Sequence, residues 1–244
     1  MEAGEGVIIV IPTYQEADAI LPLLAQLRVA IPKAYFLIVD DNSPDGTAQR
    51  VKAAARVDAN LGLIVRQQKE GIGPAYCEGF LAALHRSPRV IMQMDADGSH
   101  DPTEAVRLYV PIIEGRADLV IGSRRVRGGS TMGWSRARNL LSKFGSSYVR
   151  FLLRLHARDA TSGYRAWRPE LLRAILGEAL RADGYGFQIE MAWRAQQLGA
   201  IVIDAPITFR ERVLGASKMR AGIALEAALL VLTLMRTSFP PKRS

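Results

Sequence analysis

The chain has 244 residues, of which 49% are hydrophobic and 23% are charged, and this composition excludes an intrinsically disordered, collagen-like or coiled-coil protein. At roughly 100 to 200 residues per domain, the length allows one large domain or two small ones. The single cysteine, Cys77, excludes an internal disulfide and a zinc site built on paired cysteines, so we expect a reducing compartment such as the cytosol.

The net charge of +8 is concentrated in one segment. Residues 121–154 contain eight Lys and Arg side chains and no Asp or Glu, whereas the rest of the chain is neutral overall. The N-terminus lacks the basic start of a secretory signal. The longest apolar segment, 221–235, is interrupted by Glu226 and is shorter than the ~20 residues that span a bilayer. We therefore expect no transmembrane helix.

From residue 7 to residue 123, short apolar runs alternate with longer helical patterns. This alternation predicts an α/β fold with a mainly parallel sheet and helices on both faces. Five strands are predicted, at 7–11, 36–40, 62–66, 90–95 and 119–123, and a helix is expected after each of the first four. Asp101, Pro102 and Glu104 mark the start of the fourth helix with a capping residue, a first-position proline and a third-position glutamate.

The pattern changes beyond residue 123. A Gly-Gly-Ser loop leads into an amphipathic basic segment at 134–154. Further helices are predicted at 169–180, 187–198 and 219–236, with a strand at 201–203. Because no repeat or proline-rich linker interrupts the chain, we expect one domain over 1–218, followed by an apolar helix and basic tail at 219–244.

Acidic side chains follow three of the predicted strands, at the edge where α/β sheets bind ligands. Asp95 and Asp97 stand two residues apart, so an extended backbone would point both carboxylates the same way. A Mg²⁺ or Mn²⁺ ion shared with substrate phosphates would relieve their repulsion. The alternative is a solvated acidic turn that caps the next helix, although Asp101 already takes the capping position.

Asp40 and Asp41, at the end of the second predicted strand, suit hydrogen bonds to a ribose or a base. Taken alone, the same residues are better explained as an ordinary turn that enters a helix at Thr47. The Gly-Ile-Gly sequence at 71–73 indicates helix packing, and the chain contains no Walker loop, nucleophile elbow or HExxH motif.

A series of motifs follows along the chain: PTYQE, DDNSPDGT, GIGPAYCEGF, DADGSHDP, GSR with a following GG, DATSGYRAW, GYGFQIEM and PITFRERVLGASK. In this order they resemble the dolichol-phosphate or polyprenol-phosphate mannose synthases, which are family 2 glycosyltransferases of the GT-A fold. The resemblance spans about residues 7–220 and makes 1–218 a GT-A catalytic domain. It implies that mannose moves from GDP-mannose to the phosphate of a membrane polyprenol, with inversion at the anomeric carbon.

The resemblance also implies roles for individual residues. The nucleoside would be held by Pro12, Tyr14, Glu16, Val39 and Asp41, and the diphosphate would lie along Asp95, Ala96 and Asp97. Both aspartates would bind the metal, and Ser99 stands where some relatives carry a glutamine as a further ligand. Arg124, Arg212 and Lys218 would neutralise the diphosphate and the acceptor phosphate, so the expected catalytic set is Asp97, Arg124, Arg212 and Lys218.

The basic segment 134–154 resembles an interfacial helix, with basic residues at anionic lipid head groups and apolar ones below them. Arg138 and Ser142 would receive the lipid phosphate. A core helix with a solvated basic face remains an alternative. We expect no nucleic-acid partner, because no nucleic-acid motif accompanies the positive charge. The helix at 219–236 should pack on this segment or lie in the bilayer surface.

These features predict a peripheral enzyme on the cytoplasmic face of the membrane, bound to an anionic surface directly or through an anchoring partner protein. A UDP-glucose:polyprenyl-phosphate glucosyltransferase is an alternative, because spacing does not resolve base and sugar. A third possibility is an inactive sugar-nucleotide-binding subunit that regulates a partner. The three histidines show no zinc spacing, Glu190 is expected to be structural, and the segment 159–164 belongs to the family pattern with a role that includes shaping the acceptor loop.

Overall fold

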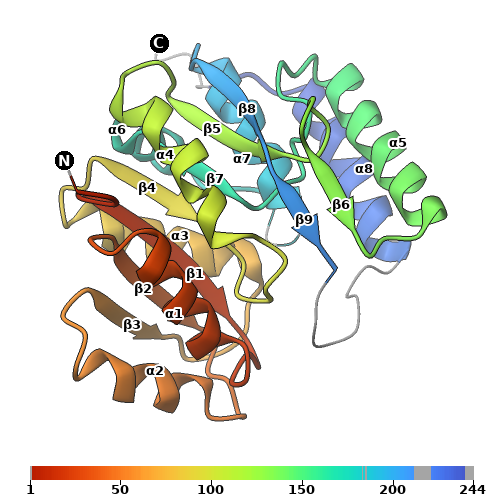
Figure 1. Cartoon of the computed structure of the whole chain (residues 1–244). Coiled ribbons are helices and arrows are strands. Elements are labelled where there is room, and N and C mark those ends of the chain that lie inside the picture. The colour runs from red at the N-terminus through yellow and green to blue at the C-terminus, as the bar shows by residue number, and fades with distance from the viewer. Residues whose placement is uncertain (1, 183, 185, 212–220, 240–244) are drawn as a thin grey trace.

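Seven strands form the main sheet in the order β3-β2-β1-β4-β7-β5-β8 (Figure 1). The computed structural model describes residues 2–182, 184, 186–211 and 221–239. The strand bounds are Val7–Thr13 for β1, Tyr35–Asp40 for β2, Leu61–Val65 for β3, Val90–Gln93 for β4, Leu119–Ser123 for β5, Arg165–Trp167 for β7 and Val202–Pro206 for β8. All five strands predicted before residue 124 are therefore confirmed.

Strands β1 to β4 run parallel to one another, and β8 runs parallel to β5. The fourth strand ends at Gln93 and not at residue 95 as the sequence predicts. The reason is that the last residue of β4 with a partner in both neighbouring strands is Gln93, beside Val10 and Arg165. Asp95 and Asp97 therefore lie in a loop, and the expectation of an extended backbone between them is wrong.

Strand β7 is absent from the sequence prediction. It runs antiparallel between β4 and β5, with Arg165 paired to Gln93 on one side and to Ile121 on the other. Strand β7 has only three residues and begins with an arginine, so its sequence contains no apolar run that would predict a strand. Its extended structure depends on pairing with β4 and β5. A second, two-stranded sheet of β6 (Ser130–Met132) and β9 (Thr208–Arg210) is likewise decided by pairing between distant segments.

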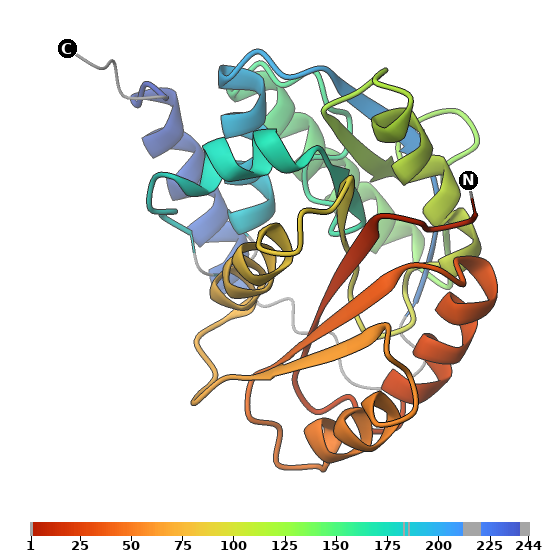
Figure 2. The same ribbon diagram turned by 90° about the vertical axis from the view of Figure 1, so that its left-hand side faces the viewer.

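Helices cover both faces of the main sheet, as predicted (Figure 2). One face carries α1 (Ile20–Ala30), α2 (Thr47–Ala55) and α4 (Ala105–Ile113), and the other carries α3 (Ile72–Leu84), α6 (Pro169–Leu176) and α7 (Gly186–Gln197). The 3₁₀ turn η1 (Pro102–Glu104) precedes α4, and the Asp101 side chain caps it by accepting from the Thr103 N–H, as expected.

Helix α5 (Arg136–Leu152) lies beside the main sheet, and α8 (Ala221–Met235) packs against it (Figure 1). Ser146 and Val149 of α5 are buried, whereas five large side chains of the helix are exposed: Leu140, Leu141, Phe144, Tyr148 and Phe151. From the sequence, the C-terminal helix is expected either to pack on the basic segment or to lie in the bilayer surface. It packs on the basic segment, with Val231 and Leu234 buried. Among the described helices, none combines the length and the apolar character needed to cross a bilayer.

Candidate active site

Three loops meet at the carboxyl edge of the sheet, because β2, β1 and β4 are adjacent parallel strands. The loops follow Thr13, Asp40 and Gln93, so the acidic side chains predicted at these strand ends lie along one rim. Helices α1, α2 and α4 follow the same three loops, with η1 before α4. The rim is therefore a local consequence of the β-α pattern in the sequence.

The loop after β1 is tied to the loop after β2 by three consecutive main-chain N–H groups. Gln15, Glu16 and Ala17 donate to Ser43 Oγ, Thr47 Oγ1 and Asp45 Oδ2, each at 3.0 Å. The polar residues of the DDNSPDGT motif thus order the PTYQE segment, which is the segment expected to contact the nucleoside.

The hydrogen bonds of the Asp40 carboxylate are made within this turn and to Thr13. Its carboxylate accepts from Thr13 Oγ1 at 2.7 Å, from the Ser43 N–H at 2.8 Å and from Ser43 Oγ at 2.7 Å, and the residue is fully buried. The interpretation of Asp40 as a turn former therefore holds, because its carboxylate is bonded within the turn itself.

Asp41 is anchored by Arg66, a residue that the sequence assigns only to the end of the third strand. Arg66 Nη1 donates to Asp41 Oδ1 at 2.6 Å, and the same guanidinium pairs with Glu70 and with Glu78. Burial raises the pKa of the Asp41 carboxyl above its ordinary value, against the opposing charge of Arg66. Three carboxylates around one buried arginine hold this corner of the rim in place.

The other nucleoside residues differ in how they can reach a ligand. Pro12, Tyr14 and Glu16 are half-buried at the rim, and Lys69 Nζ lies 3.7 Å from the centre of the Tyr14 ring. Val39 is fully buried, and its side chain packs tightly against Gly79 of α3. A Cβ at position 79 would lie only 2.8 Å from Val39 Cγ2. Only the main chain of Val39 can therefore face a ligand.

Each aspartate of the DADGS turn is held by a different neighbour. Asp95 Oδ1 accepts from the hydroxyl of Tyr76, on α3, at 3.0 Å. Asp97 Oδ1 accepts from the Ser99 N–H at 3.0 Å, and Gly98 between them has a left-handed φ of 72°. Burial, and then the charge of Asp95, raise the pKa of Tyr76 well above its ordinary value, so the hydroxyl remains a donor.

The donor set at this turn fits a magnesium or manganese ion in part. In the part of the chain that the structure describes, no group of three or more His, Cys, Asp or Glu side chains is arranged to hold a metal. Asp95 and Asp97 nevertheless match the one or two carboxylates that such an ion takes alongside substrate phosphates and water. The buried Ser99 Oγ has no hydrogen-bond partner among the described residues, so its lone pairs are not used by the protein.

Arg124 lies in a buried ion pair that the sequence does not predict. Its Nε and Nη2 donate to Asp159 Oδ2 and Oδ1 at 2.8 and 2.7 Å, and Nη2 also donates to Thr161 Oγ1 at 3.1 Å. Burial alone would lower the pKa of the Arg124 guanidinium, but Asp159 raises it above its ordinary value. The DATSGY segment therefore orients the arginine that the family pattern assigns to phosphate.

The two residues expected at the lipid phosphate, Arg138 and Ser142, both belong to α5. Ser142 Oγ accepts from Arg125 Nη2 at 2.6 Å, and Arg125 Nη1 donates to Asn139 Oδ1 at 3.0 Å. Arg138 pairs with Glu211 at 2.7 Å and stacks 4.4 Å from the Trp134 ring. Arg125, which adjoins the GSR motif, is thus a partner of Ser142 that the sequence does not predict.

Arg212 and Lys218 lie outside the described residues. Arg210, at the end of β9, donates its main-chain N–H to Ser99 O at 2.9 Å and its Nη2 to Asp101 Oδ2 at 2.9 Å. These two contacts place the end of β9 alongside the DADGS turn.

Two buried ionic groups behind the rim are structural. Glu190 accepts from the main chain of Arg181 and Ala182 at 2.9 and 3.0 Å and pairs with Arg194, as expected for a structural residue. Arg165 is fully buried and donates to Ser162 O and Ala160 O, and burial lowers its pKa to about 9. Arg165 thereby braces the loop that carries Asp159.

The mainly parallel sheet, with acidic loops at its carboxyl edge and helices on both faces, is the α/β fold expected of a GT-A glycosyltransferase. Residues 8–176 match the family described as glycosyl transferase family 2, and the chain belongs to that family. The predicted family and fold class are confirmed, and the protein is a glycosyltransferase.

Two curated relatives are similar over most of the chain. The chain is 45% identical to the undecaprenyl-phosphate mannosyltransferase of Micrococcus luteus over 92% of both proteins. It is 42% identical to the polyprenol monophosphomannose synthase of Mycolicibacterium smegmatis, over 92% of this chain and 84% of that protein.

A solved structure shares the fold at lower identity. Glucosyl-3-phosphoglycerate synthase from Mycobacterium tuberculosis, in complex with Mn²⁺, UDP and glucosyl-3-phosphoglycerate, superposes with a TM-score of 0.73 at 19% identity. The match covers 96% of this chain and 81% of that one.

Proposed function

We propose that the protein transfers mannose from GDP-mannose to the phosphate of a membrane polyprenol and so forms polyprenyl-phosphate-mannose. The observation that carries the proposal is the 45% identity with the undecaprenyl-phosphate mannosyltransferase over 92% of both proteins. The rim supports it, because the nucleoside and diphosphate residues of the family pattern lie on adjacent loops, after β1, β2 and β4. The inactive-subunit alternative finds no support in the intact Asp95 and Asp97.

In this reaction an oxygen of the acceptor phosphate attacks the anomeric carbon while the bond from that carbon to the diphosphate breaks. The sugar inverts, and GDP leaves with the electron pair. Because a phosphate monoester is already anionic at neutral pH, the step needs no general base. The protein's task is to align two anions and to offset the charge that develops on the leaving diphosphate.

For the donor, we assign the base and ribose to Pro12, Tyr14, Glu16, the main chain of Val39, and Asp41. The ordered loop contacts between 15–17 and 43–47 support this assignment, because they hold the segment before a ligand arrives. The diphosphate would lie along Asp95, Ala96 and Asp97.

We assign Mg²⁺ or Mn²⁺ to Asp95 and Asp97, with Ser99 as a candidate further ligand. When bound, the ion would supply positive charge to the leaving diphosphate. A similar fold holds Mn²⁺ together with UDP in the synthase from Mycobacterium tuberculosis, which supports the assignment.

For the cationic side of the site, we assign Arg124, Arg212 and Lys218 to charge neutralisation, and Arg138 and Ser142 to the acceptor phosphate. The ion pair with Asp159 would hold Arg124 in one orientation, and the charge of Asp95 acts on the same guanidinium. Planar arginine groups suit the recognition of phosphate oxygens.

We further propose that the enzyme works as a peripheral protein on the cytoplasmic face of the membrane, on an anionic surface and with room for an anchoring partner. The exposed apolar side chains Leu140, Leu141, Phe144 and Phe151 on a basic helix support attachment at a lipid surface.

The test is transfer of labelled sugar into lipid that partitions into organic solvent. Purified protein, undecaprenyl phosphate in detergent and Mn²⁺ are incubated with labelled GDP-mannose or with labelled UDP-glucose. We expect label in the organic phase from GDP-mannose, and none when the metal is chelated. Transfer from UDP-glucose alone would replace the mannosyl proposal by the glucosyl alternative.

A further inference from the structure

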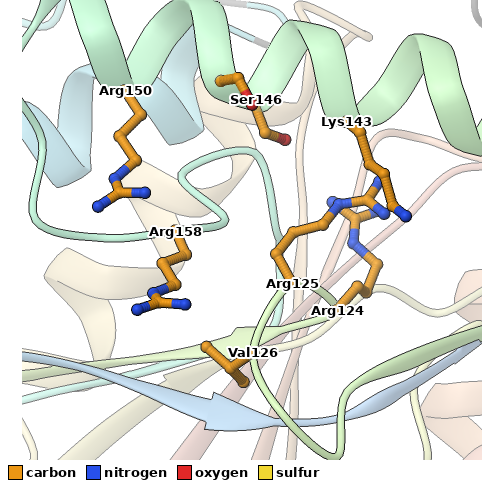
Figure 3. Close-up of a pocket in the computed structure, with 8 residues that line it drawn as sticks. Arg124, Arg125, Val126, Lys143, Ser146, Arg150 and Arg158 are labelled. Carbon is orange, nitrogen blue, oxygen red and sulfur yellow. The ribbon is translucent and has the colours of Figure 1, made fainter.

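A strongly basic cavity of about 340 Å³ lies under α5, between that helix and the loops that follow β5 and α5 (Figure 3). Five of its lining residues are cationic, Arg124, Arg125, Lys143, Arg150 and Arg158, and no acidic residue of the described chain lines it. In Figure 3, Lys143 and Arg150 extend from α5 above and the other three from the loops below, with the charged groups of Arg124, Arg125 and Lys143 together on one side of the cavity and those of Arg150 and Arg158 on the other.

Most of this charge has no acidic partner among the described residues, and three of the cations, Lys143, Arg150 and Arg158, are exposed to solvent. Arg124 pairs with Asp159, whereas Arg125, Lys143, Arg150 and Arg158 form no ion pair among the described residues. Burial, and to a smaller extent the like charge of Arg124, lower the pKa of Arg125 against the opposing charge of Asp159, and the Arg125 Nε is buried without a hydrogen-bond partner among the described residues. An anion in the cavity would relieve this repulsion and satisfy the buried donor.

The basic cavity adjoins a second cavity with a partly apolar lining. This cavity, of about 620 Å³, shares Ser147 and Arg150 with the first and continues past Phe151, Leu155 and Met235, with Arg154 also in its lining. Phe151 and Met235 are exposed, so this groove opens to the surface between α5 and α8. A cationic pocket that runs into an apolar groove is complementary to a molecule with an anionic head and a hydrocarbon tail.

The α5 residues that line the cavity lie on a different flank of the helix from Arg138 and Ser142, whereas Arg124 and Arg125, which also line it, border the assigned acceptor site. At roughly 100° per residue, Lys143, Ser147 and Arg150 project to one side of the buried Ser146, whereas Arg138 and Ser142 project to the other. We propose that the paired cavities bind one anionic glycerophospholipid, with its phosphodiester among Arg125, Lys143, Arg150 and Arg158 and an acyl chain in the groove. This lipid is not a substrate, and its binding does not depend on the proposed transfer reaction.

The test is native mass spectrometry of the full chain in detergent, with phosphatidylglycerol or phosphatidylcholine added. The variant Lys143→Gln/Arg150→Gln removes two charges from the cavity. The control Arg127→Gln/Arg136→Gln removes the same charge from nearby positions that are likewise exposed but do not line the cavity. We expect wild type and control to retain one phosphatidylglycerol and no phosphatidylcholine, and the cavity variant to retain phosphatidylglycerol at least about tenfold less, or roughly 1.4 kcal/mol.

Further arms identify the occupant. Equal retention by the cavity variant and the control would overturn the proposal, because the lipid would then respond only to overall charge. Displacement of the phospholipid by undecaprenyl phosphate would show that the cavity binds the acceptor lipid. Displacement by inorganic phosphate at the same concentration would show that the cavity binds phosphate alone. Either displacement overturns the phospholipid assignment. Circular dichroism of both variants establishes that they fold.

Discussion

The carboxylate of Asp159 receives three hydrogen bonds from Arg124, two from the guanidinium and one, at 3.0 Å, from the main-chain N–H. Both side chains are almost wholly buried. The pair joins the end of β5 to the loop that precedes β7, and Gly163 of that loop lies against Asp95. One ion pair therefore links the end of β5 to the loop that lies against the DADGS turn.

Replacement of Asp159 should destabilise the fold strongly. Asp159→Asn leaves the buried charge of Arg124 without its partner and should lower the free energy of unfolding by about 3–5 kcal/mol. Denaturant unfolding measures the change. Asp18→Asn, at a side chain that is 80% exposed, is the matched control and should be nearly neutral. Equal losses in the two variants would contradict the role of the pair.

The same carboxylate should contribute to acid sensitivity. Burial alone would raise the pKa of Asp159, but Arg124 lowers it below its ordinary value of 3.8. The contribution of Asp159 to stability is therefore fully present above that value and is lost as the pH falls through the lower folded value. Unfolding midpoints measured from about pH 5 to about pH 3 should fall less steeply in Asp159→Asn than in wild type. The same decrease of the unfolding midpoint with pH in both proteins would refute a contribution of Asp159 to acid sensitivity.

Replacement of Asp97 should remove turnover and spare the fold. Asp97→Asn keeps an oxygen for the Ser99 N–H but removes the charge, so kcat should fall by at least about 100-fold, or roughly 2.7 kcal/mol. Labelled-mannose transfer and thermal unfolding measure the two effects. Full activity in this variant, with Asp18→Asn as the reference, would remove Asp97 from the metal assignment.

Tyr76 should act as a positioning residue for Asp95. Tyr76→Phe removes the donor to Asp95 Oδ1, and the Mn²⁺ concentration for half-maximal activity should rise about fivefold, because a hydrogen bond contributes about 1 kcal/mol. Tyr164→Phe removes a comparably buried hydroxyl that donates to Asp101 O at 3.4 Å, and it serves as the control. The same metal dependence in both variants would argue against positioning.

Gly163 should be required next to Asp95. A Cβ at this position would lie 3.1 Å from Asp95 Oδ2 and 3.3 Å from Oδ1, so Gly163→Ala should displace the carboxylate. We expect kcat to fall about tenfold, which corresponds to roughly 1.4 kcal/mol. In the control Gly177→Ala, the nearest contact is an ordinary 3.5 Å. Unchanged kinetics in Gly163→Ala would show that the loop adapts to the methyl group.

The site was predictable where its geometry follows from one strand and the loop behind it. Asp95 and Asp97 follow β4 directly, and Asp101 caps η1 through a contact only two residues away. The partners of Arg124, Asp41 and Ser142 were not predicted. They are Asp159, Arg66 and Arg125, each of which reaches its partner from another element.

By itself, the sequence determined the β-α alternation, the acidic rim, the family pattern and the amphipathic character of α5, because periodicity and strand ends are local properties. Only the tertiary structure decided the position of β7, the burial of Arg124 and the basic cavity under α5. The physical reason is distance along the chain, since Arg124 meets a carboxylate 35 residues away. Charges that look alike in sequence are neutralised, stacked or left uncompensated according to what the fold packs against them.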